Sequence, residues 1–112
     1  MTKKKLMISG RIWIEIDGLN FLGSGRTELL EKVEELGSLR KAAASMGLSY
    51  RKAYYAVRTM NDIAGDPIVE LRQGGKGGGC AKLTETGRQY VVRYRQLSQA
   101  FVIFLTKQSG AF

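Results

Sequence analysis

A chain of 112 residues with 18 Lys and Arg against 10 Asp and Glu carries a net charge of +8. This length corresponds to a single domain that buries about two-thirds of the surface of the unfolded chain. The charge favours a polyanionic partner. With no histidine and one cysteine, Cys80, the sequence lacks the ligands for a zinc site, the residues for a histidine-based catalytic triad and a partner for an internal disulfide.

The sequence contains no segment that predicts membrane insertion or export. Its longest apolar run, residues 100–105, is far shorter than the roughly 20 residues needed to cross a bilayer. Lys3, Lys4 and Lys5 precede a mixed segment instead of the apolar core of a signal peptide. A single cysteine suits a reducing compartment, so we expect a cytoplasmic protein with no metal and no cofactor.

Residues 8–17 alternate between two kinds of side chain. Ile12, Ile14 and Ile16 fall on one face of an extended chain, and polar or aromatic residues fall on the other. A period of two residues predicts a half-buried strand over 8–17. The Asp-Gly pair at 17–18 is expected to end that strand as a turn.

The next periodic segment predicts a helix over residues 27–36, which ends at Gly37. Glu28 and Lys32 are spaced to pair one turn apart. The outer face of this helix is acidic and should therefore point away from a polyanion. Its apolar stripe consists of Leu29, Leu30, Val33 and Leu36.

Residues 38–64 carry the signals of two helices joined by a tight turn. Ser38 and Ser49 are natural N-caps, because a serine hydroxyl accepts a hydrogen bond from a free amide of the first helical turn. Gly47 lies where the chain must turn with a positive φ angle, which glycine adopts at no steric cost. Together these signals predict a helix–turn–helix.

The second of these helices has two different faces. Ala53, Val57 and Met60 recur at spacings of four and three residues and should point inward. The side chains between them are basic and aromatic and should point outward. This is the surface that a recognition helix presents to the major groove of DNA.

Residues 68–84 predict a β-hairpin, with strands at 68–72 and 80–84. The loop between them holds five glycines around Lys76. Its glycine spacing matches neither a P-loop nor the dinucleotide-binding fingerprint. We therefore interpret the hairpin as a wing, whose mobile tip brings backbone amides and Lys76 close to a DNA phosphate.

The last predicted helix covers residues 84–107 and begins at Thr84 as its N-cap. Its aromatic and aliphatic residues repeat at four, three, four and three positions, which is the seam of a heptad. A second copy of the chain would cover this seam in a homodimer, and the alternative is that the helix folds back over its own domain. The predicted dimer interface consists of Tyr90, Tyr94, Leu97, Phe101 and Phe104.

Four segments, in this order, resemble the N-terminal DNA-binding domain of the ModE-type, molybdate-responsive transcription regulators, which is a LysR-like winged helix–turn–helix. They are LGSGRTELL (22–30), GSLRKAAASMGLSYRKAY (37–54), MNDIAGDPIVE (60–70) and GGKGGGCAKLTETG (74–87).

The resemblance covers about two-thirds of the chain. Together with the chain length and the heptad spacing, it predicts an α+β, mainly α, single domain over residues 1–112, with a long C-terminal dimerisation helix. It implies a dimer held by the first and last helices, with residues 49–52 in the major groove and the wing on the backbone or minor groove. Position 54 is Tyr where the family usually has Trp, so we expect Tyr54 to pack and not to read a base.

The predicted DNA contacts divide by role. Arg51 and Lys52 should read base edges, because a bidentate Arg–guanine pair is the commonest specific contact. Phosphate contacts carry no sequence preference. The remaining expected contacts are Ser49, Tyr50 and Tyr55 to base or phosphate, and Arg58, Lys76 and Lys82 to phosphate.

These features predict a sequence-specific, double-stranded DNA-binding transcriptional regulator that binds a pseudo-palindromic site as a homodimer and is not an enzyme. The alternative is a protein-interaction module that uses the aromatic C-terminal helix and does not read DNA. Family members commonly continue into a C-terminal oxyanion-binding domain. This sequence ends at Phe112, so we do not expect it to bind molybdate.

Overall fold

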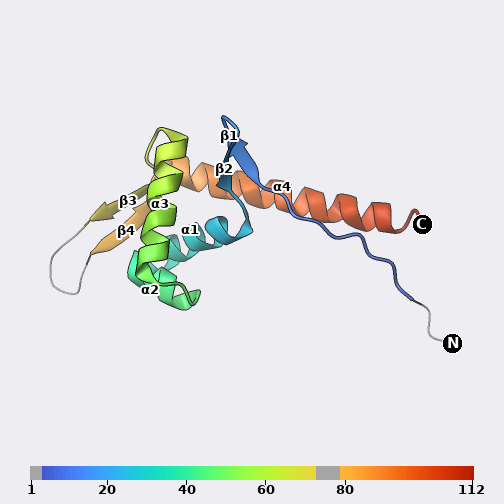
Figure 1. Ribbon diagram of the computed structural model, residues 1–112, viewed down its shortest axis with the longest axis horizontal. Helices are drawn as coiled ribbons and strands as arrows, with labels where there is room; N and C mark the ends of the chain where they lie inside the picture. The colour runs from blue at the N-terminus through green and yellow to red at the C-terminus, as the bar shows by residue number, and fades with distance from the viewer. Residues whose placement is uncertain (1–3, 73–78) are drawn as a thin grey trace.

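The computed structural model describes residues 4–72 and 79–112. Within them, helices and short antiparallel strands follow the order expected of a winged helix–turn–helix (Figure 1). None of these helices is long and apolar enough to cross a membrane. The elements are β1 (Ile14–Ile16), β2 (Leu19–Leu22), α1 (Ser24–Leu36), α2 (Leu39–Ser45), α3 (Tyr50–Ala64), β3 (Val69–Arg72), β4 (Cys80–Leu83) and α4 (Glu85–Ser109).

The helices α1, α2 and α3 pack around one core (Figure 1). Ala42 and Ala43 of α2 and Ala53 of α3 are buried, and their small side chains allow the two backbones to approach closely. Gly47, with a φ angle of 67°, makes the turn between these helices as predicted. The helix–turn–helix is thus confirmed.

Three predicted N-caps are confirmed. Each hydroxyl oxygen accepts a hydrogen bond from the amide three residues later, which satisfies one free donor at the start of the helix. The bonds are Lys41 N to Ser38 Oγ at 3.2 Å, Lys52 N to Ser49 Oγ at 3.1 Å and Gly87 N to Thr84 Oγ1 at 3.0 Å.

The predicted first strand is too long. Only Ile14–Ile16 forms β1, and it pairs with β2, a strand that the alternating pattern did not predict. Asp17 and Gly18 have φ angles of 52° and 77°, so this Asp-Gly pair makes a tight hairpin turn between two strands. The last two residues of β2 are fully buried and close one end of the core.

The first helix also differs from its prediction. It begins at Ser24, three residues earlier than expected, and ends at Gly37 as predicted. Lys32 pairs with Glu35 at 3.3 Å and not with Glu28.

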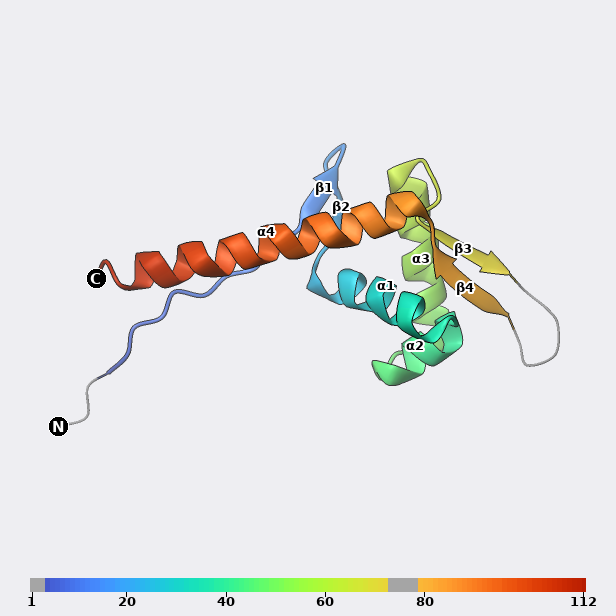
Figure 2. The ribbon, with the colours of Figure 1, turned by 180° about the vertical axis from the view of Figure 1, so that it is seen from behind.

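The acidic face of α1 fastens this helix to α4. The guanidinium of Arg95 donates two hydrogen bonds to the Glu31 carboxylate, one of them 3.0 Å long from Nε, and Arg88 Nε lies 3.1 Å from Glu34 Oε1. Figure 2 shows α1 beside α4 on the side of the molecule away from α3. The carboxylates of Glu31 and Glu34 are therefore directed toward α4.

The hairpin of β3 and β4 is anchored to α3 by one side chain. Asn61 Oδ1 accepts hydrogen bonds from the amides of Ile68 and Val69, at 2.8 and 3.2 Å, and Nδ2 donates to the Val69 carbonyl at 3.1 Å. The two strands pair from Val69 opposite Leu83 to Arg72 opposite Cys80. The predicted wing strands are thus confirmed, and Lys76 at the predicted tip lies outside the described residues.

The start of α4 crosses the wing at very close range. A Cβ atom on Gly87 would lie 2.2 Å from the carbonyl oxygen of Ile68. The same oxygen accepts a hydrogen bond from the amide of Thr84 at 3.0 Å. A glycine at this position therefore sets the distance between α4 and β3.

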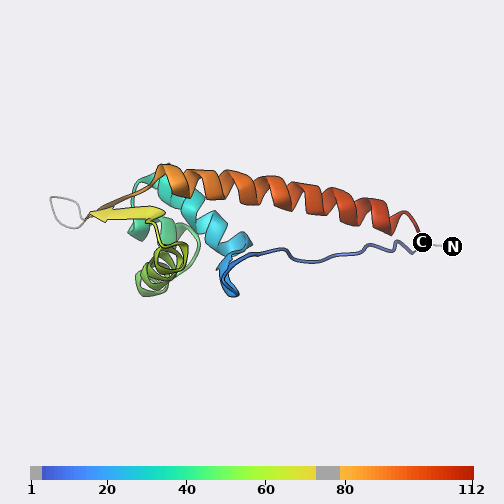
Figure 3. The ribbon, with the colours of Figure 1, turned by 90° about the horizontal axis from the view of Figure 1, so that it is seen from above.

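Residues 6–12 form an extended arm that runs beside the second half of α4 (Figure 3). The Tyr94 hydroxyl donates to the Ile12 carbonyl at 2.9 Å, and the Ile8 amide donates to Ser109 Oγ at 2.8 Å. Between these two hydrogen bonds, Gly10 lies against the ring of Phe101. The arm therefore covers one side of the helix over most of its projecting length.

The arm and the core change the role of the predicted dimer seam. Tyr94 is only 2% exposed and is a packing residue of its own protomer, which corrects its assignment to an interface. Tyr90 packs edge-on against Phe21, with ring centroids 4.8 Å apart. Leu97 and Phe101 are half-buried, whereas Phe104 remains 54% exposed.

Candidate nucleic-acid interface

The helix α3 presents one face to the core and the opposite face to solvent. Ala53, Val57 and Met60 are fully buried, as their spacing predicted. The first turn of α3 follows the Ser49 cap directly, so its side chains lie at the N-terminal end of the helix, next to the turn that joins α2 to α3. The exposed residues of the opposite face include Arg51, Lys52, Tyr55 and Arg58.

Three tyrosines form a connected row on α3. The rings of Tyr50 and Tyr54 stack at 6.1 Å, and Tyr55 meets Tyr54 edge-on at 6.2 Å. Tyr54 is half-buried and packs against the core, in agreement with its expected packing role. The other two rings are held in place by this central one and remain exposed.

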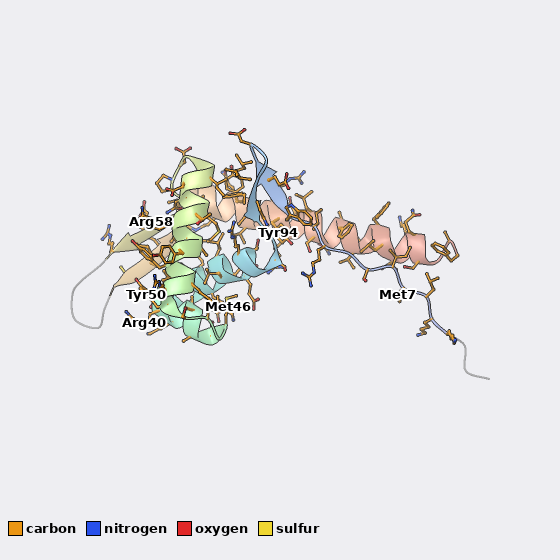
Figure 4. The ribbon with its side chains drawn as sticks, in the orientation of Figure 1. Met7, Arg40, Met46, Tyr50, Arg58 and Tyr94 are labelled. Carbon is orange, nitrogen blue, oxygen red and sulfur yellow. The ribbon has the colours of Figure 1, made fainter. Side chains whose placement is uncertain are left out.

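Two of these rings carry a guanidinium group. Arg40 of α2 lies 4.5 Å from the centre of the Tyr50 ring, and Arg51 lies 5.7 Å from the centre of the Tyr55 ring. Such contacts stabilise an exposed pair by about 0.5–1 kcal/mol. They also restrict long side chains before any ligand arrives, which lowers the entropy lost on binding. Figure 4 shows Arg40, Tyr50 and Arg58 following one another along the edge of α2 and α3.

Arg58 extends this basic surface along α3. Its pKa is raised above the ordinary value, first by a side-chain hydrogen bond with Tyr54 and also by the charge of Asp62. The guanidinium is thus a permanent cation.

Charge is distributed unevenly over the molecule. In residues 4–72 and 79–112, the ion pairs lie within α1, within α4, between these two helices and across the wing, and none of them involves α2 or α3. The acidic groups of α1 are engaged by α4, whereas the cations of α2 and α3 face solvent. This arrangement favours an anionic ligand at α3.

The remaining predicted contacts are placed as follows. Ser49 Oγ accepts the capping hydrogen bond and keeps its own hydroxyl hydrogen for donation to a ligand. Lys82 lies on the wing, 3.8 Å from Glu70, with its side chain 63% exposed. A pair this exposed is weak and leaves the ammonium group accessible.

Two important side chains were not among the predicted ones. Arg40 had a detectable signal, because burial of Leu39, Ala42 and Ala43 forces it outward. Asn61 had none, since its three hydrogen bonds to Ile68 and Val69 depend on how the chain folds back after α3, which the helical period does not show.

Comparison of the sequence with known proteins shows to which family the chain belongs. Residues 25–88 match the family described as bacterial regulatory helix-turn-helix protein, lysR family. The chain is 40% identical over 87 residues to the molybdenum transport protein ModE of Azotobacter vinelandii, covering 78% of this chain and 32% of that protein.

Two further relatives are also similar to this chain. The molybdenum-pterin-binding protein MopA of Rhodobacter capsulatus is 38% identical, with 80% of this chain and 32% of that protein covered. The DNA-binding transcriptional dual regulator ModE of Escherichia coli (strain K12) is 37% identical, with 70% and 30% covered. The chain thus spans about a third of the length of these relatives. With its winged helix–turn–helix fold and the match over residues 25–88, it belongs to the lysR family of bacterial regulatory helix-turn-helix proteins.

Proposed function

We propose that this chain binds a pseudo-palindromic site in double-stranded DNA as a homodimer and regulates transcription in the cytoplasm, without enzymatic activity. The observation that carries the proposal is the exposed face of α3, where basic and aromatic side chains are oriented by one another and none is in an ion pair of the described residues. The relative from Escherichia coli is itself described as DNA-binding, which supports the proposal.

The first turn of α3 is the part that reads sequence. In helix–turn–helix proteins the N-terminal residues of the second helix reach base edges in the major groove. Arg51 and Lys52 occupy this turn, directly after the Ser49 cap. Arg51 is suited to a bidentate contact with guanine. The wing lies to one side of α3, where Lys82 and Lys76 are proposed to meet the backbone.

The second half of α4 supports the homodimer. Val102, Ile103 and Phe104 are all more than half exposed, and three successive helical positions point to three different sides. A helix that is apolar on every side is normally buried. The arm covers the side that carries Phe101, so a second copy of the chain is the proposed cover for the others.

A symmetric dimer would place two α3 helices on two half-sites. Half-sites read in adjacent major grooves lie one helical turn, about 34 Å, apart, and their sequences are related by the twofold axis of the protein. A pseudo-palindromic operator is therefore expected.

Binding selection from a random duplex pool, followed by titration of the preferred and a scrambled duplex, tests this function. Arg51→Ala is expected to cost about 1–3 kcal/mol on the preferred duplex and to relax specificity at one base pair of each half-site. Arg93→Ala, which removes the same charge from the exposed side of α4, is the matched control. Equal weakening of both duplexes by Arg51→Ala would contradict the reading role.

The wing contact is tested in the same titrations. Lys76→Ala is expected to weaken binding to every sequence alike and to reduce the salt slope by roughly one for each phosphate that this lysine neutralises. A change in sequence preference would instead show that this lysine reads bases.

A protein-interaction module is the second candidate, and the exposed apolar end of α4 favours it. It predicts a partner whose affinity is insensitive to salt and no preference for any duplex.

A further inference from the structure

The helix α2 contributes a cation to the edge of the candidate interface. Arg40 is exposed, and its guanidinium lies 4.5 Å from the centre of the Tyr50 ring on α3. The contact joins α2 to the N-terminal end of α3. The arginine is therefore positioned by the recognition helix although it does not belong to it.

Arg40 completes a row of side chains along one side of α3. Tyr50, Tyr54 and Arg58 are spaced four residues apart, so they share one side of this helix. Tyr50 stacks on Tyr54, and Arg58 follows one helical turn after Tyr54. The row thus runs from Arg40 to Arg58 with a cation at each end and aromatic rings between them (Figure 4).

This row borders the wing. Asn61 lies seven residues after Tyr54, which is two helical turns further on the same side of α3. Its side chain bonds the backbone of β3. The side of α3 that carries the row therefore faces the wing, whereas Arg51 and Tyr55 belong to the adjacent, outward side.

We propose that Arg40 contacts a phosphate of the DNA strand that passes between α3 and the wing, with the Tyr50 ring holding its guanidinium in place. The inference rests on the proposed function, in which α3 lies in the major groove and the wing meets the adjacent backbone. The strand between the two must then pass along the row. The contact with the ring leaves the five N–H donors of the Arg40 guanidinium without a protein acceptor in the described residues, so phosphate oxygens can accept them.

The salt dependence of binding tests this contact. Each phosphate contact contributes about 0.9 to the slope of log K against log salt on B-DNA, so Arg40→Gln should reduce the slope by about 1.8 in a dimer. Between 50 and 200 mM salt the variant should lose about 12-fold less affinity than the unaltered protein. The reduction should be equal on preferred and scrambled duplexes, because phosphates carry no sequence.

Lys41→Gln is the matched control. Lys41 is the next residue on α2, is also exposed and loses the same charge, but lies outside the row. It should leave the salt slope unchanged. Arg40→Lys should keep the slope and lower the affinity, because the charge remains and the planar group is absent.

A double-mutant cycle tests the role of the ring. If Tyr50 acts partly by holding Arg40, Tyr50→Leu should weaken binding less in the Arg40→Gln background than in the unaltered protein. Additive effects would show that the ring does not position the arginine and would overturn that part of the proposal.

The outcomes separate this inference from the proposed function. If Arg51→Ala loses preference for the selected duplex while Arg40→Gln and Lys41→Gln have the salt slope of the unaltered protein, the Arg40 contact is wrong and the proposed function stands. If the unaltered chain prefers no duplex, both are wrong. A smaller slope for Arg40→Gln alone supports the contact.

Discussion

Replacing Gly87 by alanine tests how closely α4 must dock on the wing. The added Cβ would lie 2.2 Å from the Ile68 oxygen and 3.0 Å from its carbonyl carbon, whereas ordinary contacts begin near 3.4 Å. Both atoms belong to the backbone, so α4 or β3 must move by more than 1 Å. That shift stretches two hydrogen bonds of Thr84, one to the Ile68 carbonyl at 3.0 Å and one to the Pro67 carbonyl at 2.8 Å.

The expected destabilisation follows from these distances. Overpacking costs about 1–3 kcal/mol, and two weakened hydrogen bonds cost about 1 kcal/mol each, whereas alanine regains about 1 kcal/mol through its helix propensity. Gly87→Ala should therefore lower the free energy of unfolding by about 2–4 kcal/mol and Tm by about 8–16 °C. Urea unfolding followed by circular dichroism measures the first quantity, and thermal unfolding measures the second.

Gly25→Ala is the matched control, because a Cβ atom at this position of α1 would meet nothing within 4 Å. It should raise stability by up to about 1 kcal/mol. If Gly87→Ala is as stable as Gly25→Ala, the close approach of α4 to β3 does not constrain the fold, and the reasoning is refuted.

Three further variants probe other contacts. Asn61→Ala should destabilise the fold by about 2–4 kcal/mol in urea unfolding, because two amides and one carbonyl of the wing lose their partner. The pKa of Glu31 is lowered from its usual value near 4.5, chiefly by its hydrogen bond with Arg95. The Glu31–Arg95 pair therefore stabilises the folded protein fully at pH values above 4.5. This stabilisation is lost as the pH falls through the lower pKa of the folded state. Glu31→Gln should therefore lower the stability at neutral pH by less than about 1 kcal/mol and make Tm fall less on acidification. Ile103→Asp combined with Phe104→Asp should give a monomer in sedimentation, and an unaltered chain that is monomeric at micromolar concentration would contradict the proposed dimer.

The helix–turn–helix could be predicted because its signals are local. A capping serine such as Ser38 or Ser49 needs only the amide three residues later, and Gly47 needs only its own φ angle. The outward face of α3 follows from the helical period in the same way. These features depend on neighbours that the sequence places nearby.

The length of the first strand and the burial of Tyr94 were not predicted, because distant segments of the chain decide both. The pattern over 8–17 could not show that its first half leaves the hairpin and runs along α4. It also could not show that Tyr94 donates to a carbonyl 82 positions away, which buries a residue with perfect heptad spacing. The outward position of Arg40 could have been predicted from its buried neighbours, but its contact with the Tyr50 ring could not, because that contact depends on the packing of α2 against α3.

The arm along α4 also dictates an order of events when the chain is made. The amide of Ile8 bonds a side chain 101 positions later, so the arm cannot complete its docking until Ser109 has been synthesised. At about 5–20 residues per second the arm waits roughly 5–20 s for Ser109 to be synthesised. Contacts of such long range are slow to close and form after the local ones. The helix–turn–helix and the wing can therefore assemble while the arm is still unpaired, and the projecting half of α4 acquires its cover after them.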